Sequence, residues 1–246
     1  MAAIREGCRR GYYTLMQRDF SFAFRRREHD ALIIGKDPAQ LATFVFVHGA
    51  GGFKELINTY AAALEDRGIS MLAFDQSGAG KDTDNMERSS LEQRTDESLC
   101  AIERYATKEP LVICGSSMGG EVAIRMLEKF EIKSLILFCP AIYDKRAYTV
   151  RFGGGFSDII REPNSWRHAA SLEMLEKFTG KLLIIIGELD AVIPQGVIDA
   201  LDAHSSNVSQ KEIYRIPGCP HRYHQWLSEH PEESEKVIQK VVEYSV

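Results

Sequence analysis

A serine in this chain stands in a setting that suits a nucleophile. Residues 115–119 read Gly-Ser-Ser-Met-Gly, a G-x-S-x-G pattern that directly follows an apolar run and directly precedes a helical stretch. The tight turn between such elements lifts the central hydroxyl above the sheet, and it needs small neighbours because other backbone packs close to it. The register predicts Ser117 as the nucleophile, since a pattern centred on Ser116 would need glycine in place of Cys114.

A base and an acid for this serine follow later in the chain. A serine hydroxyl is a weak nucleophile and needs a base that is itself oriented by a third group. Asp190 follows an apolar run at 182–186, and His221 follows the turn Pro217-Gly218. The order serine, acid, histidine is typical of one arrangement of the triad. We therefore predict that His221 moves the Ser117 proton and that Asp190 holds the imidazole in the correct tautomer.

Other residues could fill these roles. His224 and His230 are alternatives to His221, which is favoured because it comes directly after the Pro-Gly turn. Asp144 is the reserve acid, and the alternative role for Asp190 is a helix cap. The three histidines have no cysteine or carboxylate partner at the spacing of a zinc site. We expect neither a metal nor an organic cofactor.

Backbone amides are expected to stabilise the charge that develops on the substrate oxygen. The N–H of Met118 would be one donor, and the loop at 48–52, His-Gly-Ala-Gly-Gly, lies where a second donor is needed. We expect His48 to fix this loop by a hydrogen bond rather than to act as a base. The stretch 78–81 is not a Walker A loop, because Asp75 stands where that motif needs glycine.

Short apolar runs alternate with helical stretches along the chain. Runs that are apolar on both faces are typical of parallel strands buried between two helix layers. Strands are predicted at about 11–17 and 19–27, then at 43–47, 70–74, 111–114, 135–139, 182–186 and 212–216, with helices at 56–67, 91–107, 120–130, 165–178 and 231–244. This order predicts one α/β domain over residues 1–246 with a doubly wound, mostly parallel sheet. The chemical motifs all follow strands, at the edge where such sheets bind ligands.

The segment 141–164 fits neither pattern and is expected to be a short cap insertion over one end of the sheet. It contains three consecutive glycines at 153–155, which disfavour a rigid cap. Its aromatic side chains are either an apolar layer under a loop or the wall of an acyl or aryl pocket; they are Tyr143, Tyr148, Phe152 and Phe156. If they bind substrate, so short a cap favours small to medium acyl groups.

The composition excludes several classes of protein. The 246 residues are 44% hydrophobic and 26% charged, and 30 Lys+Arg against 35 Asp+Glu give a net charge of −5. That balance argues against a nucleic-acid binder or recruitment to anionic membranes, and no apolar run reaches the length of a membrane helix. Five scattered cysteines and the lack of a signal peptide lead us to expect a cytoplasmic protein. Nothing in the composition indicates an oligomeric state.

Together these motifs resemble those of serine hydrolases of the α/β-hydrolase superfamily, over roughly residues 40–246. Residues 48–51 (His-Gly-Ala-Gly) and 117–120 (Ser-Met-Gly-Gly) resemble segments of the monoacylglycerol-lipase and lysophospholipase-like branch, and Asp75-x-x-Gly78-x-Gly80 matches a turn found in many members. The resemblance implies that Ala50 supplies the second oxyanion donor. The chain departs from many relatives at Ser116, where they have histidine, and in its short insertion, and both departures bear on the substrate.

The expected activity is hydrolysis of a small-molecule carboxylic ester or thioester through an acyl-enzyme. A serine at position 117 argues against dehalogenation and epoxide opening, which on this fold need an aspartate nucleophile. Peptide cleavage, carbon–carbon bond hydrolysis and perhydrolysis can use the same triad and stay open. A non-catalytic binding protein is the alternative class, and reaction with a fluorophosphonate probe separates it from an enzyme.

Overall fold

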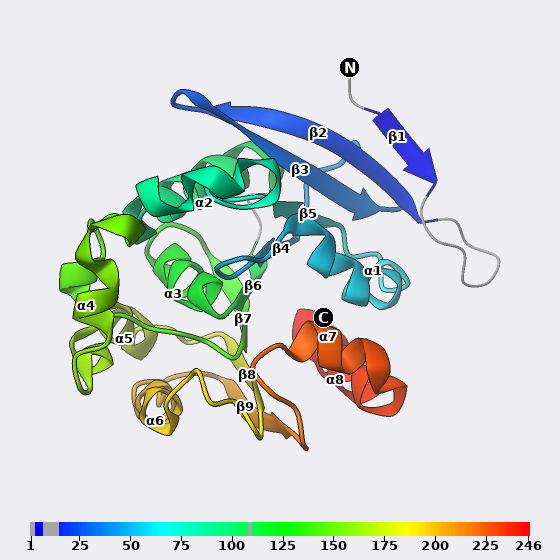
Figure 1. Ribbon diagram of the computed structural model, residues 1–246. Helices are drawn as coiled ribbons and strands as arrows, with labels where there is room; N and C mark the ends of the chain where they lie inside the picture. The colour runs from blue at the N-terminus through cyan, green and yellow to red at the C-terminus, as the bar shows by residue number, and fades with distance from the viewer. Residues whose placement is uncertain (1–2, 7–14, 108–109) are drawn as a thin grey trace.

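The computed structural model describes residues 3–6, 15–107 and 110–246 (Figure 1). In these residues nine strands form one sheet in the order β1-β2-β3-β5-β4-β6-β7-β8-β9. The strands are β1 (Ala3–Glu6), β2 (Met16–Phe24), β3 (Arg27–Gly35), β4 (Phe44–Val47), β5 (Met71–Phe74), β6 (Leu111–Ser116), β7 (Ile132–Phe138), β8 (Lys181–Gly187) and β9 (Gln210–Ile216). The pairs from β5 through β4 to β9 are parallel, and those from β1 to β5 are antiparallel. The predicted α/β class with a mostly parallel sheet is confirmed.

Helices cover both faces of this sheet. They are α1 (Asn58–Glu65), α2 (Leu91–Tyr105), α3 (Met118–Arg125), α4 (Ser157–Ile160), α5 (Ala170–Glu176), α6 (Gln195–Ala203), α7 (Tyr223–Glu229) and α8 (Pro231–Ser245). In Figure 1, α1, α7 and α8 lie on one side of the sheet, and α2, α3, α5 and α6 lie on the other.

The short central strands are buried on both sides, as their sequences predict. In β4, Val45 and Val47 belong to the core under α2 and α3, whereas Phe44 and Phe46 belong to the core under α1 and α8. All four side chains are fully buried. This alternation is the two-residue period of a strand between two helix layers.

The N-terminal region differs from the prediction. The expected strand at 19–27 corresponds to β2, while most of the expected strand at 11–17 lies outside the described residues. The strand β3 was missed, because it begins with the charged stretch 27–30 and becomes apolar only from Ala31 onward. It forms a hairpin with β2 and joins the parallel strands by pairing with β5.

Other elements were shifted or missed. The helix expected at 165–178 is a 3₁₀ turn, η6 (Ser165–His168), followed by α5, and extended backbone at Ala169 separates the two. The helix expected at 120–130 begins earlier, at Met118, and ends at Arg125. The helices α6 and α7 were not predicted.

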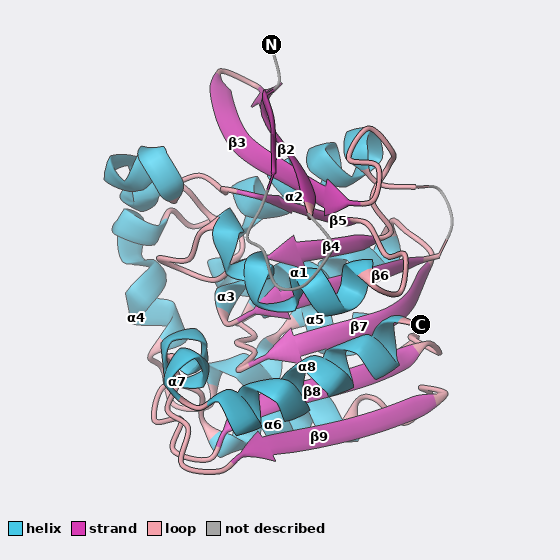
Figure 2. Cartoon of the chain, turned by 90° about the vertical axis from the view of Figure 1, so that its right-hand side faces the viewer, coloured by secondary structure: helices cyan, strands magenta, loops and turns pink. Residues whose placement is uncertain are grey.

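The segment 141–164 follows β7 at the carboxyl edge of the sheet. It consists of a 3₁₀ turn, η4 (Lys145–Ala147), one π-helical turn, η5 (Phe152–Phe156), and the short helix α4. Figure 2 shows α4 beyond the edge to which β4 and β7 point. Among the described residues, no helix has both the length and the apolar character needed to cross a bilayer.

Candidate active site

Ser117 occupies a strained turn between β6 and α3. Its backbone angles, φ 50° and ψ −118°, lie in a region that non-glycine residues rarely adopt. The strain is held in place because the Ser117 N–H donates to the Phe138 carbonyl at 2.8 Å, while the Ser117 carbonyl accepts from Gly120 and Ala141. A Cβ at Gly119 would lie 2.2 Å from the Val47 carbonyl oxygen, so this part of the pattern has no room for a side chain.

The three predicted triad residues come together at the carboxyl edge of the sheet. Ser117 Oγ lies 3.1 Å from His221 Nε2, and His221 Nδ1 lies 2.8 Å from Asp190 Oδ2. The other Asp190 oxygen, Oδ1, accepts the backbone N–H groups of Val192 and Ile193 at 2.8 and 3.0 Å. Because the Asp190 carboxylate accepts a hydrogen bond from the Nδ1–H group, Nε2 is unprotonated and presents its lone pair to Ser117.

The charge of Asp190 is stabilised by these contacts. Partial burial would raise the pKa of the carboxyl group, but the hydrogen bonds from His221, Ile193 and Val192 outweigh it and hold the pKa below its ordinary value. Asp190 is therefore ionised at neutral pH and able to stabilise a positive charge on His221.

The alternative acid and bases lie elsewhere. His224 is half-buried, and its two ring nitrogens, both shielded from solvent, have no hydrogen-bond partner within residues 3–6, 15–107 and 110–246. His230 is exposed, bonds to the Trp226 carbonyl at 2.7 Å and stacks on that indole ring. Asp144 is paired with Arg146 at 2.8 Å. Of the residues that the sequence offered as acid or base, Asp190 and His221 are the ones placed against Ser117.

His48 fixes the loop that faces the serine. Its Nδ1 lies 2.8 Å from the Gly49 carbonyl oxygen, and its Nε2 accepts the Gln76 N–H at 3.1 Å, so the proton is on Nδ1. Burial, with the positive charges of Arg94 and Lys54, lowers the pKa of His48 to about 3 despite the bond to Gly49. His48 is thus a neutral hydrogen-bonding residue, as expected from the sequence, and not a second base.

This bond has a consequence for the predicted oxyanion donors. The Gly49 carbonyl and the Ala50 N–H belong to one planar trans peptide, so fixing the carbonyl on His48 turns the N–H the opposite way. The loop packs tightly on the elbow, since a Cβ at Gly49 would lie 2.9 Å from the Ser117 Cβ. Within the described part of the chain, neither the Ala50 N–H nor the Met118 N–H has a hydrogen-bond acceptor. Their role as oxyanion donors stays a prediction.

A cavity of about 650 Å³ opens beside Ser117 and His221. Its walls come from the loop at 48–52 and the residues after it, the start of α1 and the residues that follow His221; besides Ser117 and His221 they are Gly49, Ala50, Gly51, Gly52, Phe53, Glu55, Leu56, Asn58, Thr59, Ser116, Arg222, Tyr223, His224 and Gln225. Sequence reasoning did not single out the walls at 53–59 and 222–225. Their position directly after the loop at 48–52 and after His221 was the available signal.

The four aromatic residues proposed from the sequence as substrate-binding do not line this cavity. Phe156 is buried in a cluster with Met118, and Tyr143, Tyr148 and Phe152 pack around it. The Phe156 ring centroid lies 5.3 Å from that of Tyr143 and 4.9 Å from that of Phe152. The four aromatic residues form an apolar layer that reaches Met118, the residue after Ser117. Their contact with substrate stays a prediction.

Asp190 and His221, together with Cys139, are residue types that can bind a metal ion. The Sγ of Cys139, an oxygen of Asp190 and a nitrogen of His221 lie within 4.8 Å of one another. Burial raises the pKa of the Cys139 thiol, which opposes the thiolate form that a metal needs. Asp190 and His221 are also engaged with each other, so this group fits a triad better than a metal site.

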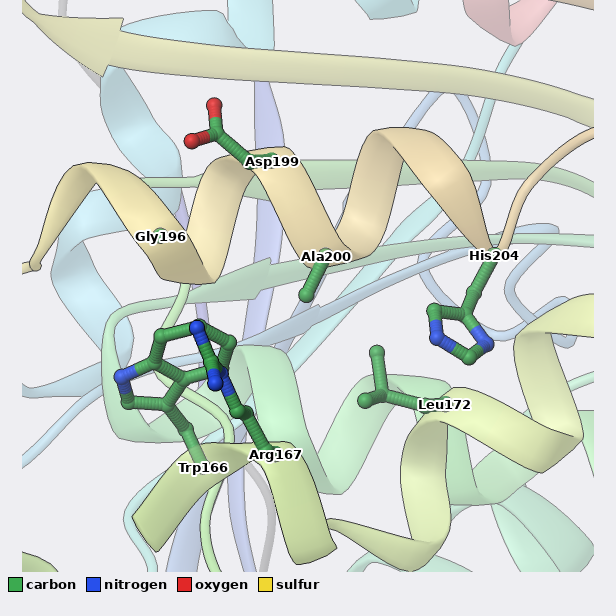
Figure 3. Close-up of a pocket in the computed structure, with 7 residues that line it drawn as sticks. All are labelled: Trp166, Arg167, Leu172, Gly196, Asp199, Ala200 and His204. Atoms are coloured by element: carbon green, nitrogen blue, oxygen red, sulfur yellow. The ribbon is translucent and has the colours of Figure 1, made fainter. Parts of the chain in front are cut away.

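A second cavity, of about 460 Å³, lies between η6 and α6 (Figure 3). The Trp166 ring lies against the backbone at Gly196, where an added Cβ would be 2.5 Å from the indole, and Leu172 lies on the far side toward His204. His204 is paired with Glu176 at 2.7 Å. This cavity contains no member of the triad.

Comparison with known proteins places the chain in a family. A family model described as serine aminopeptidase, S33, matches residues 38–163, which is just over half of the 246 residues. No curated protein sequence matches the chain at a significant level.

Several solved structures have similar folds. They include an acylaminoacyl peptidase of Pyrococcus horikoshii (TM-score 0.69, 19% identity, 95% of this chain and 41% of that one). Est1E from Butyrivibrio proteoclasticus, in a structure with bound ferulic acid, has a TM-score of 0.60 at 20% identity, covering 87% of this chain and 96% of that one. A thioesterase domain from the curacin biosynthetic pathway has a TM-score of 0.65 at 16% identity, covering 91% and 99%. The chain thus spans less than half of the Pyrococcus peptidase but nearly all of Est1E and of the thioesterase domain. The likeness shows that the chain and these three proteins share one fold.

Proposed function

The chain belongs to the serine aminopeptidase S33 family of α/β-hydrolases, and we propose that it is a serine hydrolase that cleaves carboxylic esters or thioesters of small to medium acyl groups. The observation that carries the proposal is the continuous chain of two hydrogen bonds, 3.1 Å from Ser117 to His221 and 2.8 Å from His221 to Asp190. A nucleophile, a base and an orienting acid at these distances are what acyl transfer to serine requires.

Acylation would begin with attack of Ser117 Oγ on the carbonyl carbon of the substrate. The hydroxyl proton passes to His221 Nε2, and Asp190 stabilises the imidazolium that forms. The carbonyl oxygen becomes negative and accepts hydrogen bonds from the N–H groups of Met118 and Ala50. The bond to the leaving oxygen or sulfur then breaks, and His221 gives that atom its proton.

Deacylation would repeat these steps with water. His221 takes a proton from water as the water oxygen attacks the acyl carbon, and the same two amides hold the negative charge. The bond from Ser117 Oγ breaks, the serine regains its proton from His221, and the free acid leaves. No step requires a metal or an organic cofactor.

The cavity beside the triad supports a substrate of modest size. Its volume, about 650 Å³, lies within the range of small-molecule sites. Its walls combine apolar side chains such as Phe53 and Leu56 with polar ones such as Asn58 and Gln225. This mixture suits a compact ester with polar groups better than a long acyl chain.

A peptidase activity is the second candidate. It is favoured by the family description and by the similar fold of the Pyrococcus acylaminoacyl peptidase, although the chain covers only 41% of that protein. The chemistry would be the same, with His221 protonating an amine as the leaving group.

A panel of acyl esters, acyl thioesters and aminoacyl anilides tests both candidates. We expect turnover of esters or thioesters by the wild type, and loss of that turnover in Ser117→Ala. A monoacylglycerol in the panel tests the sequence resemblance to that lipase branch. Turnover confined to anilides would favour the peptidase, and no turnover or probe labelling of any kind would favour a binding protein.

A further inference from the structure

A second hydrogen bond runs beside the one between nucleophile and base. Tyr223 Oη donates to Ser116 Oγ at 3.0 Å, and both residues are buried. Ser116 directly precedes Ser117, and Tyr223 is two residues after His221. The end of β6 and the start of α7 are therefore joined next to the catalytic pair, through two hydroxyl groups that the mechanism does not use.

The tyrosine is well placed to hold its loop. It is the first residue of α7, and its ring stacks on Phe138 with centroids 4.7 Å apart and planes 11° apart. Phe138 also accepts the Ser117 N–H through its carbonyl oxygen. The ring thus packs on the residue that holds the nucleophile elbow, while the hydroxyl reaches the elbow itself.

The loop that carries His221 is already held on the side before the imidazole, where the Cys219 carbonyl accepts the Leu189 N–H at 2.9 Å and the Gly218 N–H donates to Glu188 at 2.8 Å. His221 lies between Pro220 and the start of α7, outside any helix or strand, and its Nδ1 bond to Asp190 fixes one edge of the ring. The bond from Tyr223 to Ser116 supplies a fixed point two residues after the imidazole, so the loop is held on both sides of His221.

We propose that the bond between Tyr223 and Ser116 is a clamp that sets the distance between His221 and Ser117. Both residues are then positioning residues of the triad, an inference that rests on the proposed function of Ser117 as nucleophile. Displacement of a reacting group by about 1 Å can lower a rate by about 10²-fold, so partial relaxation of the clamp is expected to lower it by about 10-fold.

The test uses Ser116→Ala, Tyr223→Phe and the double variant. Phenylalanine keeps the ring that stacks on Phe138, so only the hydroxyl bond is lost. Each single variant leaves one hydroxyl of the pair buried without its partner, which can lower stability. The double variant removes both hydroxyls, so it still tests the clamp if a single variant is unstable. Ser134→Ala is the matched control, because Ser134 is a buried serine whose hydroxyl has no hydrogen-bond partner in the described residues.

The rate of labelling by a fluorophosphonate measures the nucleophile without knowledge of the substrate. In this reaction Ser117 Oγ forms a bond to phosphorus, the phosphorus–fluorine bond breaks, fluoride leaves, and the serine proton passes to His221. We expect each single variant to label about 10-fold more slowly than the wild type. The double variant should also be about 10-fold slower than the wild type, with no further loss, because all three variants remove the same interaction. Ser134→Ala should label as fast as the wild type. With a substrate, kcat should fall while KM stays within about 2-fold.

Three results would overturn the clamp. Labelling rates equal to that of the wild type would show that the bond does not position the triad. A loss near 100-fold in the double variant would show two independent effects. A rise in KM with kcat unchanged would instead mean that the hydroxyls contact substrate. Failure of the wild type to label at all would contradict the proposed function itself, so the two failures are distinct.

Discussion

The half-buried imidazole of His224 should make the protein less stable in mild acid. Its ring lies among Tyr223, Tyr60 and Phe46, with centroids 4.0, 6.4 and 6.1 Å away, and its nitrogens, shielded from solvent, have no hydrogen-bond partner among the described residues. Burial lowers the pKa of His224 from 6.5 to about 3. The unfolded chain therefore binds a proton between these pH values that the folded protein does not bind, so stability falls as pH drops below the unfolded value.

The size of this effect follows from linkage. For one such group, lowering the pH from 7.5 to 5.0 lowers the free energy of unfolding by about 2 kcal/mol. The variant His224→Phe lacks the group, and its ring suits an aromatic site without hydrogen bonds. We expect the loss of stability between these pH values to be about 2 kcal/mol smaller in this variant than in the wild type. His48, whose pKa is also about 3, contributes equally to both proteins and cancels.

Urea unfolding at pH 7.5 and 5.0, followed by circular dichroism for both proteins, gives this difference directly. Carboxyl groups with a raised pKa, such as buried Glu121, act in the opposite direction but are present in both proteins. Equal losses in the wild type and the variant would refute the description of His224 as a neutral buried residue. Loss of nearly all turnover in a folded His224→Phe would move the role of base from His221 to His224.

Three further predictions concern the site. Gly119→Ala should lower kcat by about 10²-fold or more and reduce the melting temperature, because its Cβ would lie 2.2 Å from the Val47 carbonyl oxygen; wild-type activity in this variant would contradict the packing at the elbow. His221→Ala should remove nearly all turnover, measured as kcat, because the group that accepts the Ser117 proton is then absent, and a kcat near that of the wild type would assign the role of base to another group. Across an acyl-chain series, each added methylene should raise kcat/KM by a factor equivalent to at most about 0.8 kcal/mol, until the series flattens; a steady rise to sixteen carbons would contradict a short pocket.

The sequence was sufficient to predict what depends on local pattern. The apolar runs at 43–47 and 182–186 became strands because a strand buried on both faces needs little beyond its own composition. The turn at Ser117 was also predictable from local sequence, because the backbone that approaches position 119 leaves room only for glycine. The position of Asp190 and His221 after successive strands then followed from the parallel topology.

Features that depend on tertiary contacts were not predictable in the same way. The strand β3 starts with charged residues and is recognised only by its pairing with β2 and β5. Nothing in the types of Ser116 and Tyr223 indicates that they bond, because they are 107 positions apart. The aromatic residues of the cap were identified, but whether they face a substrate depends on packing that residue types do not specify.

The central claim is that Ser117 is a covalent nucleophile activated by His221. The most direct test is reaction of the protein with a fluorophosphonate, followed by tandem mass spectrometry of the tryptic peptides. We predict a single adduct on Ser117, its absence in Ser117→Ala, and at least about 10³-fold slower formation in His221→Ala, since the base then no longer accepts the serine proton. An adduct on Ser116 or on any other residue, or undiminished labelling without His221, would contradict the account.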